Sequence, residues 1–129
     1  MTDRDTYDRG LRRRRQVLGD EYVDANLAGA DELTRTFQEL VTVQVWGRAW
    51  EGDALDDRTR ALVTLGILAA LGKFDELETY AKAAIRTGAS VEDIRDVLVH
   101  VTAYCGAPAG RQAFLAASRG LRSTGAIGS

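Results

Sequence analysis

Apolar residues in this chain recur at the spacing of α-helices, and no useful length of sequence alternates in the manner of a β-strand. A single proline, Pro108, stands among the 129 residues, so helical segments meet few residues that would break them. We therefore predict an all-α fold of about six helices with short connections, packed as one helical bundle.

Helix-capping and helix-ending residues divide the chain into segments. Asp31, Asp56 or Asp57, and Ser90 precede apolar periodic stretches and are predicted N-caps, while Asp75 with Glu78 resembles a capping pair. Residues 24–30 are ambiguous between helix and loop, and 51–54 read as a polar loop. The predicted helical segments run from about 4 to 18, from Asp31 to the 46–50 stretch, from Asp56 or Asp57 to Gly72, from Asp75 to Gly88, from Ser90 through Val101, and from Pro108, in the first turn, through Leu121.

Length and composition set the broad class of the protein. We expect residues 1–122 to form one domain, which is large enough to bury a core without staples, and 123–129, mostly small residues, to form a flexible tail. A net charge of −2 argues against nucleic acid as a partner. The chain opens without the apolar stretch of a signal peptide, and no segment reaches the roughly 18 apolar residues of a membrane span. We therefore expect a cytoplasmic protein with no membrane partner.

The segment from Thr59 to Leu71 is apolar nearly all round. A helix of this kind belongs in the middle of a bundle or in a subunit interface. A chain of this size can cover only part of such a cylinder, so we predict a homo-oligomer in which apolar faces are buried between copies.

Few residues offer obvious chemistry. No Cys/His cluster has metal-ligand spacing, and one histidine cannot anchor the common zinc sites, so we predict no metal. The run 12–15 consists of four arginines, which sweep about 300° around a helix and therefore cannot form one binding face. A solvated, ion-paired surface is the simpler interpretation of this run, and contact of one or two arginines with a carboxylated ligand is the alternative.

Two rows of polar residues border apolar helix stripes and are better candidates for a site. Asp96, His100 and Tyr104 are four residues apart, and Glu76 and Tyr80 form a similar pair. Each row is equally compatible with ordinary surface contacts on a helix edge.

Trp46 and Trp50 also share one helix face. Core or interface packing is their simpler interpretation, and lining a substrate pocket is the alternative. Cys105 has no second thiol and is expected to be a small buried hydrophobic residue.

An ordered series of motifs resembles the carboxymuconolactone decarboxylase family over roughly residues 7–120. The stretch 10–20 contains Arg14 within RRQVLGD and resembles the family's opening, and Trp46-Gly47 with Trp50 resembles a second signature. RTRALVTL at 58–65 resembles a third, and the match continues through 70–77 and through Tyr104, Gly106 and Pro108. The resemblance implies an alkylhydroperoxidase-like helical fold and, for oligomeric state, a trimer or a hexamer.

The same resemblance bears on the chemistry. Lys73 and Glu76 stand where the related peroxidases carry two cysteines, which excludes thiol-pair peroxidase chemistry. Decarboxylases of the family usually carry Glu-x-x-x-His on this helix, whereas this chain has Tyr80 in place of the histidine. A phenol normally titrates near pH 10, so Tyr80 can donate a hydrogen bond or a proton but is a poor base.

The implied reaction is a cofactor-independent decarboxylation of a small carboxylated lactone such as 4-carboxymuconolactone. The electrons left by carbon dioxide pass through the ring double bond into the lactone carbonyl, so the substrate is its own electron sink. We expect Arg14 or Arg60 to pair with a substrate carboxylate and Trp46, Trp50 and Tyr104 to line the substrate site. Glu76, Tyr80 and His100 are the predicted catalytic residues.

Two alternatives remain open on the sequence. One is a sister enzyme of specialised metabolism, such as an isomerase, a lactone-modifying enzyme or a decarboxylase with another substrate. The other is a catalytically silent, oligomeric binding protein. The tyrosine at position 80 favours both of them over a routine catabolic decarboxylase.

Overall fold

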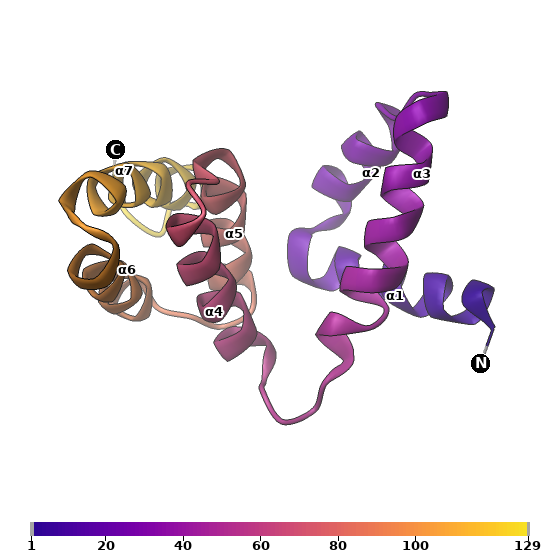
Figure 1. Cartoon of the computed structure of the whole chain (residues 1–129), viewed down its shortest axis with the longest axis horizontal. Helices are drawn as coiled ribbons and strands as arrows, with labels where there is room; N and C mark the ends of the chain where they lie inside the picture. Colours follow the sequence, from indigo (N-terminus) through magenta and orange to yellow (C-terminus); the bar gives the residue numbers. More distant parts are fainter. Residues whose placement is uncertain (1, 129) are drawn as a thin grey trace. The chain divides into compact units, whose positions relative to one another are not determined.

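The computed structural model describes residues 2–128, and every regular element in that range is helical (Figure 1). The all-α prediction is therefore confirmed, with seven α-helices where about six were expected. Two short elements, the π-helical turn η1 and the 3₁₀ turn η2, accompany them. The elements are α1 (Asp3–Leu18), α2 (Asp20–Ala28), α3 (Glu32–Val41), η1 (Thr42–Trp46), η2 (Ala49–Glu51), α4 (Asp57–Ala70), α5 (Phe74–Arg86), α6 (Val91–Cys105) and α7 (Ala107–Thr124).

The additional helix is α2, which covers most of the segment that the sequence left ambiguous. Gly19, with φ of 90°, ends α1 and lets the chain turn directly into α2. Val23 is the one residue of α2 that is buried among the described residues, so this helix lacks the apolar stripe that a periodicity argument needs.

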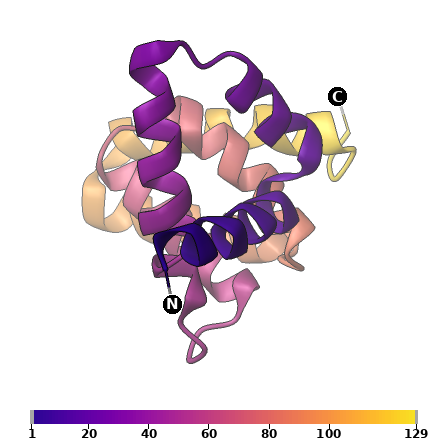
Figure 2. The ribbon, with the colours of Figure 1, turned by 90° about the vertical axis from the view of Figure 1, so that its right-hand side faces the viewer.

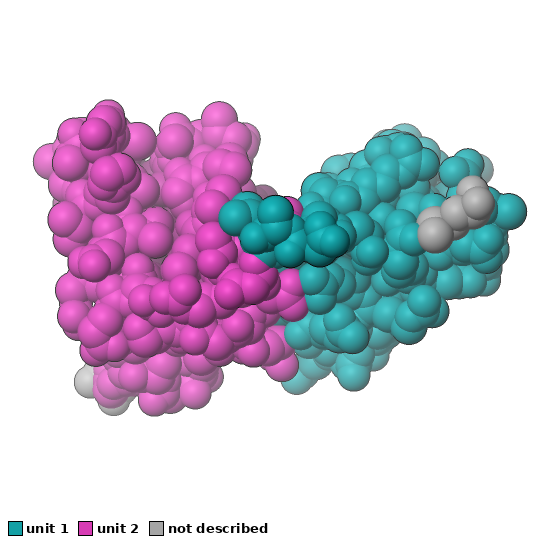
Figure 3. Space-filling model, turned by 90° about the horizontal axis from the view of Figure 1, so that it is seen from below, with its two compact units in different colours: residues 1–55 teal, residues 56–129 magenta. Residues whose placement is uncertain are grey.

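The chain divides into two compact units, residues 1–55 and residues 56–129, which Figure 3 colours separately. Unit 1 contains α1 to α3 with η1 and η2, and unit 2 contains α4 to α7. The prediction that residues 1–122 form one domain stays a prediction. Helix α7 continues to Thr124, so Ser123 and Thr124, which were expected to begin the tail, are helical.

Predicted N-caps at three helices are confirmed. The side chains of Asp31, Asp56 and Ser90 accept hydrogen bonds from the backbone N–H three residues later. The Asp75–Glu78 capping pair is wrong, because α5 begins at Phe74 and has no side-chain cap. Helix α5 begins earlier than predicted because α4 ends in a tight turn. The N–H of Lys73 donates to the carbonyl of Leu68 at 2.8 Å, and the chain enters α5 at the next residue.

In unit 1, α1 runs across the end of α3 at the π-helical turn η1 (Figure 2). A Cβ atom at Gly10 would overlap the carbonyl oxygen of Thr42, and one at Gly47 would come within 2.7 Å of the Thr6 side chain. The crossing is therefore possible only with glycine at both positions. The N–H of Gly47 donates to the Thr42 carbonyl at 2.8 Å, which closes the wide π turn.

In unit 2, α4 and α7 each pack against both α5 and α6. The interior consists of aliphatic side chains from α4 to α6 and small residues on α7, with Leu65, Leu77, Ile94 and Leu98 among the most deeply buried. Helix α4 buries only one side: Ala61, Leu65 and Ala69 are buried, while Val63, Ile67 and Leu71 are 47, 53 and 65% exposed. No helix among residues 2–128 is long and apolar enough to cross a membrane.

Candidate functional site

The candidate residues fall into both units. Arg14, Trp46 and Trp50 belong to unit 1, and Arg60, Glu76, Tyr80, His100 and Tyr104 belong to unit 2. Two pairs are in direct ring contact, Trp46 with Trp50 and His100 with Tyr104.

The two tryptophans form a stacked pair inside unit 1. Their ring centroids lie 4.9 Å apart with 26° between the planes, and the side chains are 2 and 4% exposed. The π turn and the following 3₁₀ turn place the two rings one above the other. This burial favours the core-packing interpretation, and the lining of a substrate pocket stays a prediction.

Arg14 is also buried in unit 1, at 4% exposure. Its guanidinium donates to Gln38 Oε1 at 2.8 Å and to Thr42 Oγ1 at 3.2 Å. Both acceptors lie where α3 passes into the π turn, so the Arg14 side chain links α1 to that turn by hydrogen bonds. Its predicted pairing with a substrate carboxylate stays a prediction.

The other arginines of the run 12–15 have different surroundings, as the helical sweep predicts. Arg13 donates to the Trp50 carbonyl, and Arg15 forms ion pairs with Asp20 at 3.2 Å and Asp24 at 2.8 Å. Arg12 is exposed. The four side chains therefore do not act as one patch.

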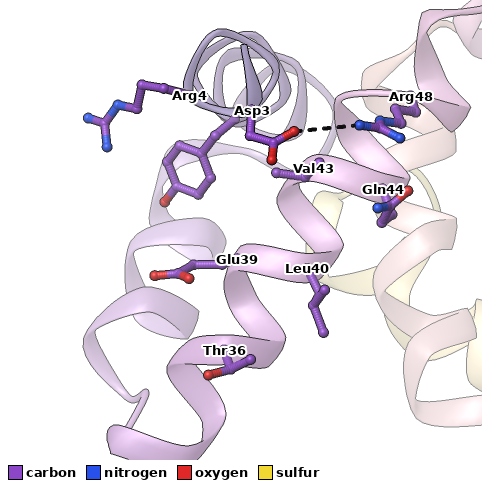
Figure 4. Close-up of a pocket in the computed structure, with 9 residues that line it drawn as sticks. Asp3, Arg4, Thr36, Glu39, Leu40, Val43, Gln44 and Arg48 are labelled. Carbon is purple, nitrogen blue, oxygen red and sulfur yellow. Dashed lines mark ion pairs between the residues drawn. The ribbon is translucent and has the colours of Figure 1, made fainter.

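Unit 1 also contains a cavity that the sequence did not reveal (Figure 4). Its volume is about 650 Å³. Arg48 at its wall forms an ion pair of 3.8 Å with Asp3, and Arg4 pairs with Asp8 at 3.4 Å. The lining residues are Asp3, Arg4, Tyr7, Thr36, Glu39, Leu40, Val43, Gln44 and Arg48. These residues come from two segments far apart in sequence, so no local sequence motif predicted the cavity.

In unit 2, Glu76 and Tyr80 lie one turn apart on α5. Glu76 is in the first turn and exposed, and Tyr80 is half-buried. Arg60 lies in the first turns of α4, the helix that packs directly on α5, and is half-buried. No hydrogen bond or ion pair joins Glu76 to another described residue, so its carboxylate is available to a ligand.

His100 and Tyr104 lie one turn apart near the end of α6. Their ring centroids are 4.6 Å apart with 39° between the planes, and Tyr104 is 80% exposed. Asp96 is exposed and forms no ion pair with His100 in the described range, so the partner of the histidine ring is Tyr104 and not the carboxylate. Cys105, expected to be buried, is exposed, because it ends α6 one residue before Gly106 turns the chain into α7.

No group of three or more His, Cys, Asp or Glu side chains among residues 2–128 is arranged to hold a metal ion. The five unit 2 candidates supply a carboxylate, two phenols, an imidazole and a guanidinium, carried on α4, α5 and α6. Such groups can bind a carboxylate, donate hydrogen bonds to a developing oxyanion and transfer a proton.

Known proteins match this chain across the segment that carries the unit 2 candidates. The model of the carboxymuconolactone decarboxylase family matches residues 32–119, which run from α3 into α7 and include all five of the unit 2 candidates. The 4-carboxymuconolactone decarboxylase of Acinetobacter baylyi is 31% identical over 125 residues, covering 97% of this chain and 93% of that protein.

The chain belongs to the carboxymuconolactone decarboxylase family. A second relative, the nitrosuccinic acid decarboxylase npaB of Metarhizium robertsii, is 38% identical over 102 residues, covering 79% of this chain and 71% of that protein. The resemblance found from the sequence motifs is thereby confirmed. Both relatives are named as decarboxylases, which supports a carboxy-lyase activity for this member of the family.

Proposed function

We propose that this protein is a cofactor-independent decarboxylase of a small carboxylated substrate. The observation that carries the proposal is the family match over α3 to α7, the segment that contains Arg60, Glu76, Tyr80 and His100. A small molecule bearing one or more carboxylates is the common element of the two relatives' named substrates.

The two named substrates share a second property that removes the need for a cofactor. In nitrosuccinic acid the nitro group must sit on a carbon that bears a carboxyl group, because succinic acid has no other carbon that can carry it. Loss of carbon dioxide leaves an electron pair that passes into the nitro group, as it passes into the lactone carbonyl of 4-carboxymuconolactone. The enzyme then has to bind the carboxylate, stabilise the resulting oxyanion and protonate carbon.

We assign these tasks to unit 2. Arg60 pairs with a substrate carboxylate through its planar guanidinium fork. Tyr80, or His100 beside Tyr104, donates to the oxyanion or to carbon, a step that contributes about 10²–10⁴-fold when the acid is well positioned. Glu76 forms no hydrogen bond with Tyr80 in the described range, so we assign it the transfer of the proton and not the orientation of the phenol. Arg14, the alternative partner for the carboxylate, already donates to Gln38 and Thr42 inside unit 1.

One observation favours a second candidate function, a sister decarboxylase with a different substrate. Tyr80 occupies the position where members of the family usually carry histidine, and a phenol does not act as a base near neutral pH. The Metarhizium robertsii relative is named for nitrosuccinic acid, an acid other than the lactone. A catalytically silent binding protein is the remaining alternative, and absence of turnover on every acid tested would favour it.

Turnover of site variants tests the assignment. Glu76→Gln, Tyr80→Phe and His100→Gln are compared with the wild type by release of labelled carbon dioxide. Glu92→Gln is the matched control, because Glu92 is also an exposed glutamate in the first turn of a helix. We expect at least a ten-fold loss in Glu76→Gln and Tyr80→Phe and none in the control.

Unchanged turnover in all three site variants would contradict the assignment, while loss in His100→Gln alone would move the site to α6. Tyr80→His restores the usual family residue. A gain in activity on 4-carboxymuconolactone in this variant would support a redirected substrate preference, and a loss on every acid would show that the phenol itself is required.

A further inference from the structure

A second cavity in unit 1, of about 250 Å³, is lined by positively charged side chains. It lies between α1 and the 3₁₀ turn η2. The residues around it are Arg9, Arg12, Arg13, Gln16, Trp50 and Glu51. Trp50 was predicted from the sequence to line the substrate site, but the catalytic assignment uses residues of unit 2 alone and none of these six.

The spacing of the α1 residues explains why they meet at one cavity. Positions 9, 12, 13 and 16 follow the i, i+3, i+4, i+7 pattern, which places all four side chains on one face of a helix. The run 12–15 does not indicate this face by itself, because only Arg12 and Arg13 of the run lie on it. Arg9, outside the run, completes it.

Arg9 and Arg13 are bound to the segment that faces α1 across the cavity, residues 47–51. Arg9 donates to the Gly47 carbonyl at 2.6 Å and pairs with Glu51 at 3.3 Å. Arg13 donates to the Trp50 carbonyl through Nε and Nη2, both at 3.3 Å. These contacts fix the position of the wall and of two guanidinium groups before any ligand arrives, which reduces the entropy lost on binding.

Arg12 differs from its neighbours. It is exposed, and it forms no hydrogen bond or ion pair with the rest of the described chain. Its guanidinium therefore retains its donors for a ligand. Gln16, one turn further along α1, adds a side-chain amide that can donate as well.

The local charge is opposite in sign to that of the whole chain. Three guanidinium groups and one carboxylate line the cavity, which leaves an excess of two positive charges, whereas the chain carries −2. The volume corresponds to about eight water molecules at roughly 30 Å³ each. A ligand that fits both the size and the charge is a small oxyanion.

We propose that this cavity binds a small organic or inorganic oxyanion, a carboxylate or a phosphate group, with Arg12 as its principal ligand. The planar fork of the guanidinium donates hydrogen bonds to two oxygens of such a group at once. Arg9 and Arg13 supply a positive field from fixed positions, and Gln16 donates from the side. The site is independent of the proposed function, because it makes no use of the residues assigned to the reaction.

Isothermal titration of the full chain with succinate and with inorganic phosphate tests this site, with chloride as the anion that offers no oxygens. Arg12→Ala is the site variant. Arg111→Ala on α7 is the matched control, because it removes the same charge from another exposed arginine. Thermal unfolding of each variant verifies that the fold is retained.

We expect saturable binding of succinate, phosphate or both, at least ten-fold weaker in Arg12→Ala, unchanged in Arg111→Ala, and weaker at high ionic strength. Binding of one anion and not the other identifies the group that the site takes. Absence of saturable binding of both oxyanions overturns the proposal. Equal affinity in Arg12→Ala and the wild type, or equal binding of chloride, overturns it as well.

Discussion

The buried guanidinium of Arg14 donates a hydrogen bond to Thr42 Oγ1 at 3.2 Å, and Thr42 in turn donates to the Gln38 carbonyl at 2.7 Å. Replacing Thr42 by valine leaves an Arg14 donor without its acceptor in the interior of unit 1. We expect a loss of about 1–3 kcal/mol in the free energy of unfolding, measured in urea. Arg12→Ala, which removes an exposed arginine of the same helix, serves as the control and is expected to stay within about 0.5 kcal/mol of the wild type.

Close packing of α7 against α5 gives a second prediction, from a pair of glycines. A Cβ at Gly120 would overlap the backbone carbonyl of Glu78, whereas a Cβ at Gly66 meets nothing within 4 Å. Gly120→Ala should therefore lose about 1–3 kcal/mol through overpacking. Gly66→Ala should be neutral or gain up to about 1 kcal/mol, because alanine favours the helix. Similar unfolding free energies for the two variants would contradict the described α5–α7 crossing.

The third prediction concerns acid. The Ser90 N–H, and after it the Arg58 guanidinium, lower the pKa of Asp93 below its ordinary value of 3.8. Because the folded-state pKa is the lower one, the stabilising effect of Asp93 is complete above the unfolded-state value and is lost as pH falls through the folded-state value. Asp93→Asn should therefore lower the melting temperature at pH 7, by an amount that shrinks as the pH falls below 3.8.

Asp96→Asn is the control for this effect, since Asp96 is exposed on the same helix and forms no ion pair with described residues. Its melting temperature should follow the wild type at both ends of the pH range. A difference between Asp93→Asn and the wild type that stays constant down to strongly acid pH would contradict the assigned cap.

Exposed apolar stripes underlie a fourth prediction, that of a homo-oligomer. Leu33, Phe37 and Leu40 on α3 are 82, 57 and 55% exposed, and α4 carries a second stripe. Burial of such surface contributes about 25 cal/mol per Å² before the costs of association. Light scattering should give a mass well above the 14.0 kDa of one chain. Phe37→Glu should reduce that mass, Tyr22→Glu should leave it unchanged, and a monomeric wild type would contradict the prediction.

Features that depend on local sequence were predicted well. The N-caps Asp31 and Ser90 are set by a side chain and a backbone group three residues apart, so a short sequence window contains all the information they need. The same holds for α7, where Pro108 lies in the first turn.

Features that depend on contacts between distant segments were missed. The π turn at Thr42 forms where Gly10 allows α1 to pack closely against it, and no local sequence pattern predicts this contact between α1 and η1. The basic cavity likewise needs η2 as its opposite wall. Its α1 face, however, was recoverable from the spacing of Arg9, Arg12, Arg13 and Gln16.

The candidate site was only partly accessible to sequence reasoning. The polar row of α6 was found from its spacing, and His100 does contact Tyr104 across one turn. Burial of Arg14 could not be read from a run of four similar residues, because its environment depends on where α3 crosses α1. The catalytic roles of Glu76, Tyr80 and His100 stay predictions.

The most direct test of the central claim is release of carbon dioxide by the purified wild-type chain. Nitrosuccinic acid and 4-carboxymuconolactone, each ¹³C-labelled at the carboxyl group expected to leave, would be incubated with the protein in the presence of a strong chelator. The account predicts labelled carbon dioxide from at least one of the two acids, at a rate well above the uncatalysed reaction and unaffected by the chelator. Release at the uncatalysed rate from both acids, or activity that disappears on chelation, would contradict it.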